Sequence, residues 1–157
     1  MKAVKRSTAR RPVKVFLSHA MADRALAQKV TKLLCTHLNS RVFTNEDIKP
    51  EERWQAKLLK QLENADVFVA LLTPNSISDS WLLQETGAAW GLDKPIIPLV
   101  SHLDILDRFP IQLRSYPSLD LKDLNTTKGS KRFAEALDRA LAESQISTSF
   151  SYAHPRP

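Results

Sequence analysis

The run Asp66-Val-Phe-Val-Ala-Leu-Leu72 and the segment Ser76-Ile-Ser-Asp-Ser-Trp-Leu-Leu-Gln-Glu85 decide the fold and place its candidate site. The first is a continuous apolar run, which predicts a strand buried on both faces of a parallel sheet. In the second, Trp81 and Glu85 are four residues apart and share one face of a helix. Ligands bind outside the carboxyl ends of strands in open α/β sheets. The pair therefore predicts a pocket for a flat ring, with a carboxylate that stabilises positive charge or removes a proton.

Apolar runs and amphipathic helical patterns alternate along the chain. We expect strands at 13–17, 41–44, 67–72, 95–100 and 118–121, and helices at 23–38, 54–62, 80–91, 102–109 and 130–143. This alternation predicts an α/β fold of the flavodoxin-like kind, a five-stranded parallel sheet in the order 2-1-3-4-5 with helices on both faces. In that order, the loops after the first and third strands flank one crevice.

Single residues add local expectations. Asp23 stands where the first helix begins and is expected to cap it. Pro98 cannot donate to a ladder, which suits a strand end or an edge strand. Gly87 and Gly91, on one helical face, are expected to permit close packing, with Gly91 ending the helix. Cys35, the only cysteine, lies on an amphipathic helix and is expected to be packed and inert.

Composition bounds the class of protein. The length of 157 residues suits one domain. The single cysteine excludes an intramolecular disulfide and fits a reducing, cytoplasmic setting. No apolar stretch reaches the roughly 18 residues of a membrane span, so no membrane partner is expected. We expect a basic flexible arm at 1–12, one domain at 13–143 and a flexible tail at 144–157.

The net charge of +6 does not predict a nucleic-acid partner. Five basic residues and no acidic residue fall within 1–12, which leaves 18 basic and 17 acidic residues in the rest of the chain. A basic arm is commonly a solvated, mobile terminus. The expected folded body has no basic stripe and no aromatic platform for bases.

Four segments, in order and at matching intervals, resemble TIR domains of the prokaryotic, NAD-cleaving class. They are Val15-Phe-Leu-Ser-His-Ala-Met-Ala-Asp23, Asp47-Ile-Lys-Pro50 with Trp54, Leu71-Leu-Thr-Pro-Asn-Ser76 with Trp81 and Glu85, and Lys94-Pro-Ile-Ile-Pro98. The likeness runs from about residue 13 to 100 and continues loosely to 143. Glu51 departs from the family, which often has glycine after the proline of the BB loop, and this departure concerns the loop's conformation.

The resemblance implies cleavage of the nicotinamide–ribose bond of NAD⁺, giving nicotinamide and ADP-ribose or a cyclic isomer, in prokaryotic defence signalling. NAD⁺ is then a substrate, and no cofactor or metal is expected. Glu85 is the implied catalytic residue. The implied substrate-binding residues are Ser18, His19, Ala20, Phe43, Asp47, Ile48, Lys49, Ser76 and Trp81. The implied BB-loop interface for self-association is Ile48, Lys49 and Pro50. A separate sensor or effector protein is a further candidate partner.

Other interpretations stay open. A non-enzymatic TIR interaction module would use the BB loop, but Glu85 counts against it. A nucleoside deoxyribosyltransferase-like enzyme would use a glutamate as nucleophile, but the 47–50 loop is not expected there. For Glu85 the alternative is a solvated position on the helix, and for Trp81 it is a position in the core. His19 is expected to bond the backbone in its loop in preference to acting as a base, and Trp54 and Trp90 are read as structural.

Overall fold

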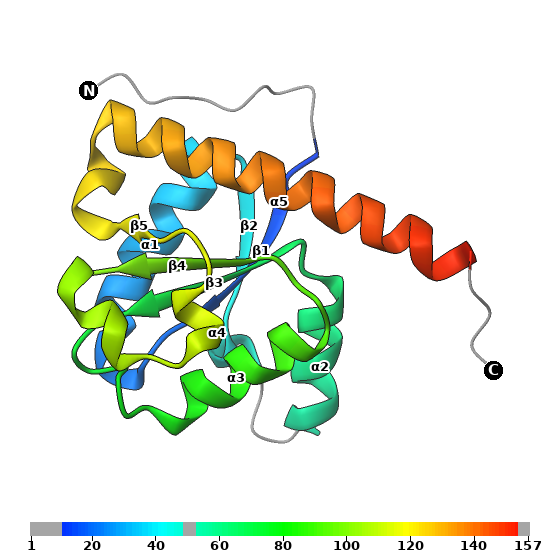
Figure 1. Cartoon of the computed structure of the whole chain (residues 1–157), viewed down its shortest axis with the longest axis horizontal. Helices are drawn as coiled ribbons and strands as arrows, with labels where there is room; N and C mark the ends of the chain where they lie inside the picture. Colours follow the sequence, from blue (N-terminus) through cyan, green and yellow to red (C-terminus); the bar gives the residue numbers. More distant parts are fainter. Residues whose placement is uncertain (1–10, 49–52, 154–157) are drawn as a thin grey trace.

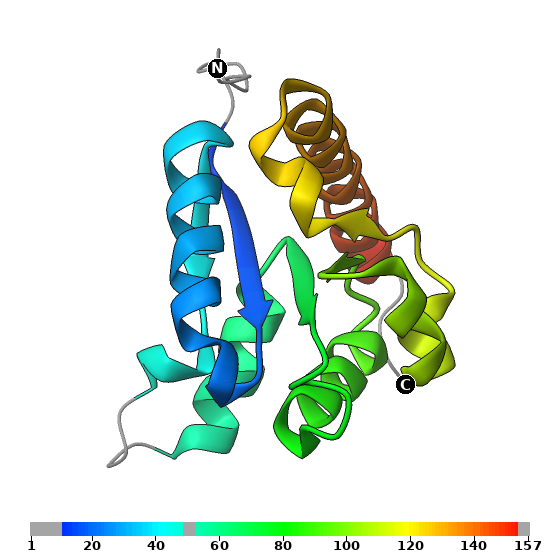
Figure 2. The same ribbon diagram turned by 90° about the vertical axis from the view of Figure 1, so that its left-hand side faces the viewer.

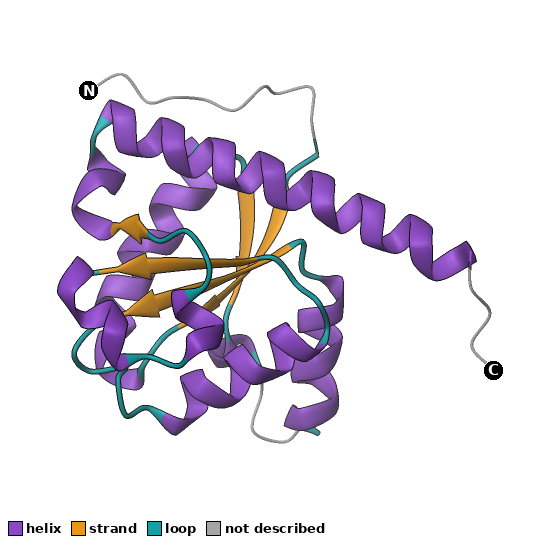
Figure 3. Ribbon diagram, viewed as in Figure 1, coloured by secondary structure: helices purple, strands orange, loops and turns teal. Residues whose placement is uncertain are grey.

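A five-stranded, all-parallel sheet in the order β2-β1-β3-β4-β5 forms the centre of the molecule, with helices on both sides (Figures 1 and 3). The computed structural model describes residues 11–48 and 53–153, and of residues 145–153 the backbone alone. The strands are β1 (Val13–Ser18), β2 (Ser40–Phe43), β3 (Val67–Leu72), β4 (Ile96–Val100) and β5 (Leu119–Asp120). The predicted fold class and strand order are confirmed.

The helices cover the sheet in two layers. They are α1 (Arg24–His37), α2 (Trp54–Asn64), α3 (Ser80–Gly91), α4 (Ile111–Arg114) and α5 (Thr127–Ala153), with 3-10 helices at Met21–Asp23, Asn45–Asp47, Leu103–Arg108 and Leu121–Asn125. Residues of α1 and α5 join one core, and those of α2, α3 and α4 join the other (Figure 2). The sequence did not predict α4, because a single turn is too short to show a helical period.

Strand β3 shows why the sheet carries two cores. All six of its residues are buried, as the apolar run predicts. Its side chains alternate between the faces, so Val67, Val69 and Leu71 pack with α1 and α5. Phe68 and its neighbours on the other side pack with α2, α3 and α4. The ring of Phe68 stacks on Phe16 of β1 with centroids 5.8 Å apart.

Pro98 lies in an inner strand, because β4 pairs with both β3 and β5. The expectation of an edge strand was therefore wrong. The Ser101 amide donates to the Leu72 carbonyl at 2.9 Å, so the odd-numbered residues around β4 face β3. Pro98 faces the other way, towards β5, whose pairing begins only at Leu99. The N–H that Pro98 lacks would point towards β5, so no hydrogen bond between β4 and β3 is lost.

Helix α5 is longer than the sequence predicted. It continues to Ala153, ten residues past the expected end at 143, and its C-terminal part projects beyond the sheet (Figure 1). No glycine or proline falls between 130 and 153, so nothing in the chain breaks the helix. The expected loose tail is therefore helical as far as Ala153, and 154–157 lie outside the described residues.

The last residues of the expected basic arm are tied to the domain. Residues 1–10 lie outside the described residues, but the Arg11 guanidinium donates to both carboxylate oxygens of Asp66, at 2.7 and 2.9 Å. The Lys14 amide donates to the same carboxylate at 2.9 Å. Burial acts to raise the pKa of Asp66, but these hydrogen bonds and the Arg11 charge outweigh it and lower the pKa. Arg11 is thus a structural contact.

Two further local expectations were wrong. No heavy atom of a neighbouring element lies within 4 Å of a Cβ built on Gly87 or Gly91, so these glycines do not serve close packing, although α3 does end at Gly91. Cys35 is exposed. The buried stripe of α1 consists of Ala27, Val30 and Leu34, and Cys35 falls on the next, outward position of the helix.

Candidate active site

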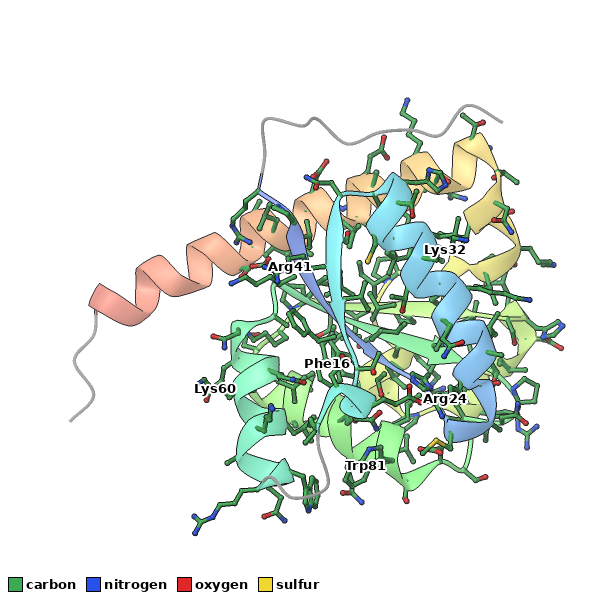
Figure 4. The ribbon with its side chains drawn as sticks, turned by 180° about the vertical axis from the view of Figure 1, so that it is seen from behind. Phe16, Arg24, Lys32, Arg41, Lys60 and Trp81 are labelled. Atoms are coloured by element: carbon green, nitrogen blue, oxygen red, sulfur yellow. The ribbon has the colours of Figure 1, made fainter. Side chains whose placement is uncertain are left out.

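The carboxyl ends of β1 and β3 lie side by side, because the two strands pair with Ser18 opposite Ala70. The segments that follow them, 19–23 and 73–79, therefore meet at one edge of the sheet. Figure 4 shows Arg24, at the start of α1, and Trp81, at the start of α3, at this end of the molecule, with Arg41 towards the opposite end. The topology thus creates the predicted crevice position.

Glu85 is the most unusual side chain at this edge. It is 1% exposed, so the interpretation as a solvated helix residue was wrong. The Ser18 hydroxyl donates a short hydrogen bond to its Oε2. Its Oε1 makes no hydrogen bond of good geometry among the residues that the structure describes, although the Asn45 side chain lies close enough to affect the carboxyl group. One oxygen is therefore fixed by the protein, and the other has unused capacity to accept a hydrogen bond.

The same surroundings change the acidity of Glu85. Burial raises its pKa to about 7, with a smaller contribution of the same sign from the Asp79 charge, while the Ser18 hydroxyl and the Asn45 side chain act in the opposite direction. A carboxyl group ordinarily ionises far below neutral pH. Near pH 7, Glu85 is therefore poised between its neutral and ionised forms, which is characteristic of functional groups in clefts.

Trp81 makes an aromatic contact beside this carboxyl. Its indole is half-buried and meets the indole of Trp54, with ring centroids 4.7 Å apart and planes at 45°. Trp54 is 40% exposed and begins α2. From the sequence, Trp54 was interpreted as a structural residue, and its ring contact with Trp81 was not predicted. Its position directly after the BB loop was the available signal.

The residues of the first loop are buried and have defined partners. Ser18 is fully buried and its hydroxyl is used on Glu85. His19 is 4% exposed, and its Nδ1 lies 2.9 Å from the Ala20 carbonyl, which confirms the expected bond to the backbone. Its Nε2 is 3.9 Å from Glu46 Oε1. Ala20 is buried too.

Asp23 does not cap α1, contrary to the expectation. It is 6% exposed, and it makes no side-chain bond to the helix. Its carboxylate instead accepts hydrogen bonds from the side chains of Thr73 and Asn75 in the second loop. Ser76, an implied substrate residue, is fully buried and bonds both the amide and the carbonyl of Thr73 at 2.8 and 3.0 Å. Its hydroxyl shapes the turn.

The described part of the BB loop faces partly inward. Phe43 and Ile48 are half-buried and pack against the core under α2, α3 and α4. Ile48, an implied interface residue, thus directs its side chain towards the core. Asp47 is exposed and accepts from the Thr44 amide at 2.8 Å, which closes the 3-10 helix that follows β2. Lys49 and Pro50 lie outside the described residues.

A groove of about 370 Å³ lies beside some of the implied substrate residues. It runs between α1 and the end of β2. Its lining residues are His19, Arg24, Ala27, Gln28, Thr31, Lys32, Cys35, Thr36, Val42, Thr44, Glu46 and Asp47. Glu85 does not line it, so His19 and Asp47 border a groove to which Glu85 does not contribute. Within 11–48 and 53–153, no group of three His, Cys, Asp or Glu residues is arranged to hold a metal.

Comparison with known families decides the assignment of the fold. A family model described as TIR domain matches residues 15–141. The chain belongs to the TIR domain family. The match includes the first loop, the BB loop and both Trp81 and Glu85. None of the TIR domain's described helices combines the length and apolar character needed to cross a membrane.

Relatives and solved structures place this TIR domain among diverse proteins. It is 25% identical over 139 residues to NAD(+) hydrolase tir-1 of Caenorhabditis elegans, an alignment that covers 83% of this chain and 14% of that protein. The TIR domain therefore spans a small part of that relative. The TIR domains of the activated Roq1 resistosome, which directly recognises the pathogen effector XopQ, superpose with a TM-score of 0.56 at 14% identity, covering 83% of this chain and 98% of that one. This likeness shows the shared fold.

A weaker likeness is to a 2-deoxyribosyltransferase of Bacillus psychrosaccharolyticus. It has a TM-score of 0.48 and 20% identity, and it covers 71% of this chain and 96% of that one.

Proposed function

We propose that this TIR domain cleaves NAD⁺ between nicotinamide and ribose, with Glu85 as the catalytic carboxylate. The observation that carries the proposal is a buried glutamate with one oxygen bonded to Ser18 and the other making no hydrogen bond of good geometry among the described residues. Membership of the TIR family and the similarity to a relative named as an NAD⁺ hydrolase support the choice of substrate. NAD⁺ is proposed as the substrate, with no cofactor.

The main requirement of the reaction is that the protein stabilises the positive charge that develops on the ribose. The bond between ribose C1′ and the ring nitrogen breaks, and both its electrons go to nicotinamide, which leaves neutral. The ribose becomes oxocarbenium-like. An ionised Glu85 facing that developing charge stabilises the transition state more than the ground state, with Oε1 accepting a hydrogen bond from a ribose hydroxyl. Water then bonds to C1′ and releases a proton, giving ADP-ribose.

The raised pKa of Glu85 sets the pH dependence of this chemistry. In the free protein the group is half-ionised at about pH 7, and only the ionised form stabilises the cation. The positively charged nicotinamide ring of bound NAD⁺ favours ionisation, because an opposite charge nearby lowers the pKa of an acid. We expect kcat/KM to rise with pH up to about 7 and then level off.

Trp81 and Trp54 supply the apolar side of the proposed site. The two indoles contact each other, and both retain exposed surface on which a flat ring can stack. Stacking would hold the nicotinamide ring and exclude water. A drier site would favour attack by an adenine nitrogen on C1′, which gives a cyclic isomer of ADP-ribose in place of the linear product.

Several finer features belong to the same proposal. They are self-association through the BB loop, a separate sensor or effector protein as partner, a cytoplasmic location and a role in prokaryotic defence. If association completes the site, specific activity should rise with protein concentration over a hundredfold dilution series. Flat specific activity would contradict association. Ile48→Asp is a poor probe here, because Ile48 packs against the core and its loss affects folding.

The decisive experiment is incubation of the purified protein with NAD⁺, with products resolved by mass spectrometry. Nicotinamide release by the wild type should fall at least about a hundredfold in Glu85→Gln, the scale of losing one preorganised electrostatic partner. Glu63→Gln, an exposed residue of α2, is the matched control and should match the wild type. Nicotinamide release by Glu85→Gln at the wild-type rate would exclude the catalytic assignment. No turnover by the wild type at any concentration would favour the non-enzymatic interaction module.

A further inference from the structure

We infer that Asp23 is a positioning residue, whose bonds to Thr73 and Asn75 hold the loop before α3 so that Glu85 meets Ser18. The inference rests on the proposed function for its kinetic consequence, but its geometric basis is independent of any substrate. It concerns three residues of two loops, which we call the loop clamp: Asp23, Thr73 and Asn75.

The residues of the loop clamp are joined by three hydrogen bonds. Thr73 Oγ1 donates to Asp23 Oδ2 at 2.5 Å, and Asn75 Nδ2 donates to Asp23 Oδ1 at 2.8 Å. The Asn75 amide donates in turn to Thr73 Oγ1 at 3.1 Å. Asp23 and Thr73 are 6% and 4% exposed, so water competes little for these bonds. Each oxygen of the Asp23 carboxylate thus accepts one hydrogen bond from the second loop.

The clamp lies between the two halves of the candidate site. Asp23 is five residues after Ser18 along the first loop, and Thr73 begins the loop that enters α3 at Ser80. Ser18 is already fixed by pairing of β1 with β3. Glu85 is held by α3, whose Leu82 and Ala89 pack in the core, and the N-terminus of α3 directly follows the clamped loop. The clamp therefore fixes the end of α3 nearest the loops, and with it the approach of Glu85 to the Ser18 hydroxyl.

The geometry makes activity sensitive to the clamp. A catalytic group misplaced by about 1 Å can lose on the order of a hundredfold in rate. A loop that shifts by less should move the Ser18–Glu85 hydrogen bond first, because hydrogen bonds weaken steeply with length and angle. Loss of that bond removes a stabiliser of the ionised carboxylate. The expected signature is a fall in kcat together with a higher pKa of Glu85, and little change in KM.

Thr73→Val tests the inference, because it keeps the side chain's shape and removes the hydroxyl that bonds Asp23. Its matched control is Thr86→Val in α3. Thr86 is also buried, at 3% exposed, and among the described residues its hydroxyl bonds the Leu82 carbonyl of its own helix, at 2.8 Å. The two variants lose the same chemical group from similar burial. Thr73→Ser, which keeps the hydroxyl, should rescue activity.

We expect Thr73→Val to lower kcat about tenfold, with KM within about twofold, while Thr86→Val keeps the wild-type kcat and melts at a similar temperature to Thr73→Val. Titration of Glu85 by carboxyl ¹³C NMR should give a higher pKa in Thr73→Val than in Thr86→Val. Equal kcat and equal Glu85 titration in the two variants would overturn the inference. Absence of NAD⁺ cleavage by the wild type would contradict the proposed function. The NMR comparison of the two variants would then be the test of whether the loop clamp positions Glu85.

Discussion

Two buried carboxyl groups stand at opposite ends of the sheet, and the protein treats them in opposite ways. Asp66, at the entrance to β3, accepts two hydrogen bonds from Arg11 and one from the Lys14 amide, and its pKa is lowered. Glu85, at the other end, has the Ser18 hydroxyl on one oxygen and, among the described residues, no hydrogen bond of good geometry on the other. Its pKa is raised to about 7.

The difference separates a structural carboxylate from a candidate catalytic one. Burial penalises charge on both groups. At Asp66, a cation and a backbone donor compensate the penalty, so the ion contributes to folding. At Glu85 the compensation is incomplete, so the carboxylate costs stability when it ionises. Incomplete compensation of this kind is typical of sites that gain a partner only with a ligand.

The largest expected effect is a pH-dependent gain of stability in Glu85→Gln. Well below pH 4.5 the Glu85 carboxyl is neutral in both the folded and the unfolded state, so burial of this group does not lower the free energy of unfolding. Between pH 4.5 and about 7 the unfolded chain ionises while the folded state resists, which lowers the free energy of unfolding by about 3 kcal/mol. Glutamine does not titrate and can still accept the Ser18 hydrogen bond.

Urea unfolding of the wild type and Glu85→Gln at pH 4, 6 and 8 measures this difference. The free energy of unfolding of the variant should increase relative to that of the wild type as pH rises, and it should still be larger at pH 8. A constant difference across the range would mean that Glu85 titrates normally, and the comparison with Asp66 would lose its basis.

Asp66→Asn should show the opposite behaviour, with a loss of about 2 kcal/mol at pH 7. Breaking a buried ion pair can cost more, but Arg11 is 46% exposed and water replaces part of what it loses. Because the folded pKa of Asp66 is lowered, its contribution is present above its unfolded pKa and disappears as pH falls through the folded pKa.

The measurement is the same urea series extended to low pH, where the wild type and Asp66→Asn should converge. NAD⁺ cleavage by folded Asp66→Asn should equal that of the wild type, because Asp66 lies at the far end of the sheet from Glu85. Equal stability of the two proteins at pH 7 would show that the Arg11 contact contributes nothing.

The smallest expected effect is that of Ser18→Ala on the pH profile. Removing the hydroxyl withdraws a hydrogen bond to a charged group, worth about 1.5 kcal/mol, and raises the pKa of Glu85. At pH 7 kcat/KM should fall about tenfold, and activity should recover partly at pH 8.5. An unchanged profile would mean that the Ser18 hydroxyl does not stabilise the ionised carboxylate.

The sequence predicted those parts of the molecule that periodicity governs. The apolar run of β3 marked a strand buried on both faces, and the four-residue spacing of Trp81 and Glu85 marked one face of α3. Alternation of strands and helices then led to the strand order. These signals are local, so a window of about ten residues contains them.

The contacts that escaped prediction join residues distant in the chain. Asp23 meets Thr73 across 50 residues, and Arg11 meets Asp66 across 55. A carboxylate at the start of a helix, such as that of Asp23, can either cap the helix or bond a second loop. The tertiary structure determines which of the two bonds forms. The inward turn of Ile48 likewise depends on the core beneath it. The end of α5 was missed because residues 144–157, which are rich in serine and proline, were interpreted as a flexible tail, although serine weakens a helix only slightly.

The pairing of Ser18 with Glu85 also governs when the site can exist during synthesis. The two residues are 67 positions apart, an interval that a ribosome covers in roughly 3 to 13 seconds at 5–20 residues per second. The α5 residues Leu137 and Leu141, which complete the core on one face of β1 and β3, emerge later still. A nascent chain therefore cannot bring the Ser18 hydroxyl to the Glu85 carboxyl group until at least residue 85 has been made, and the core on the α5 side is completed only after that.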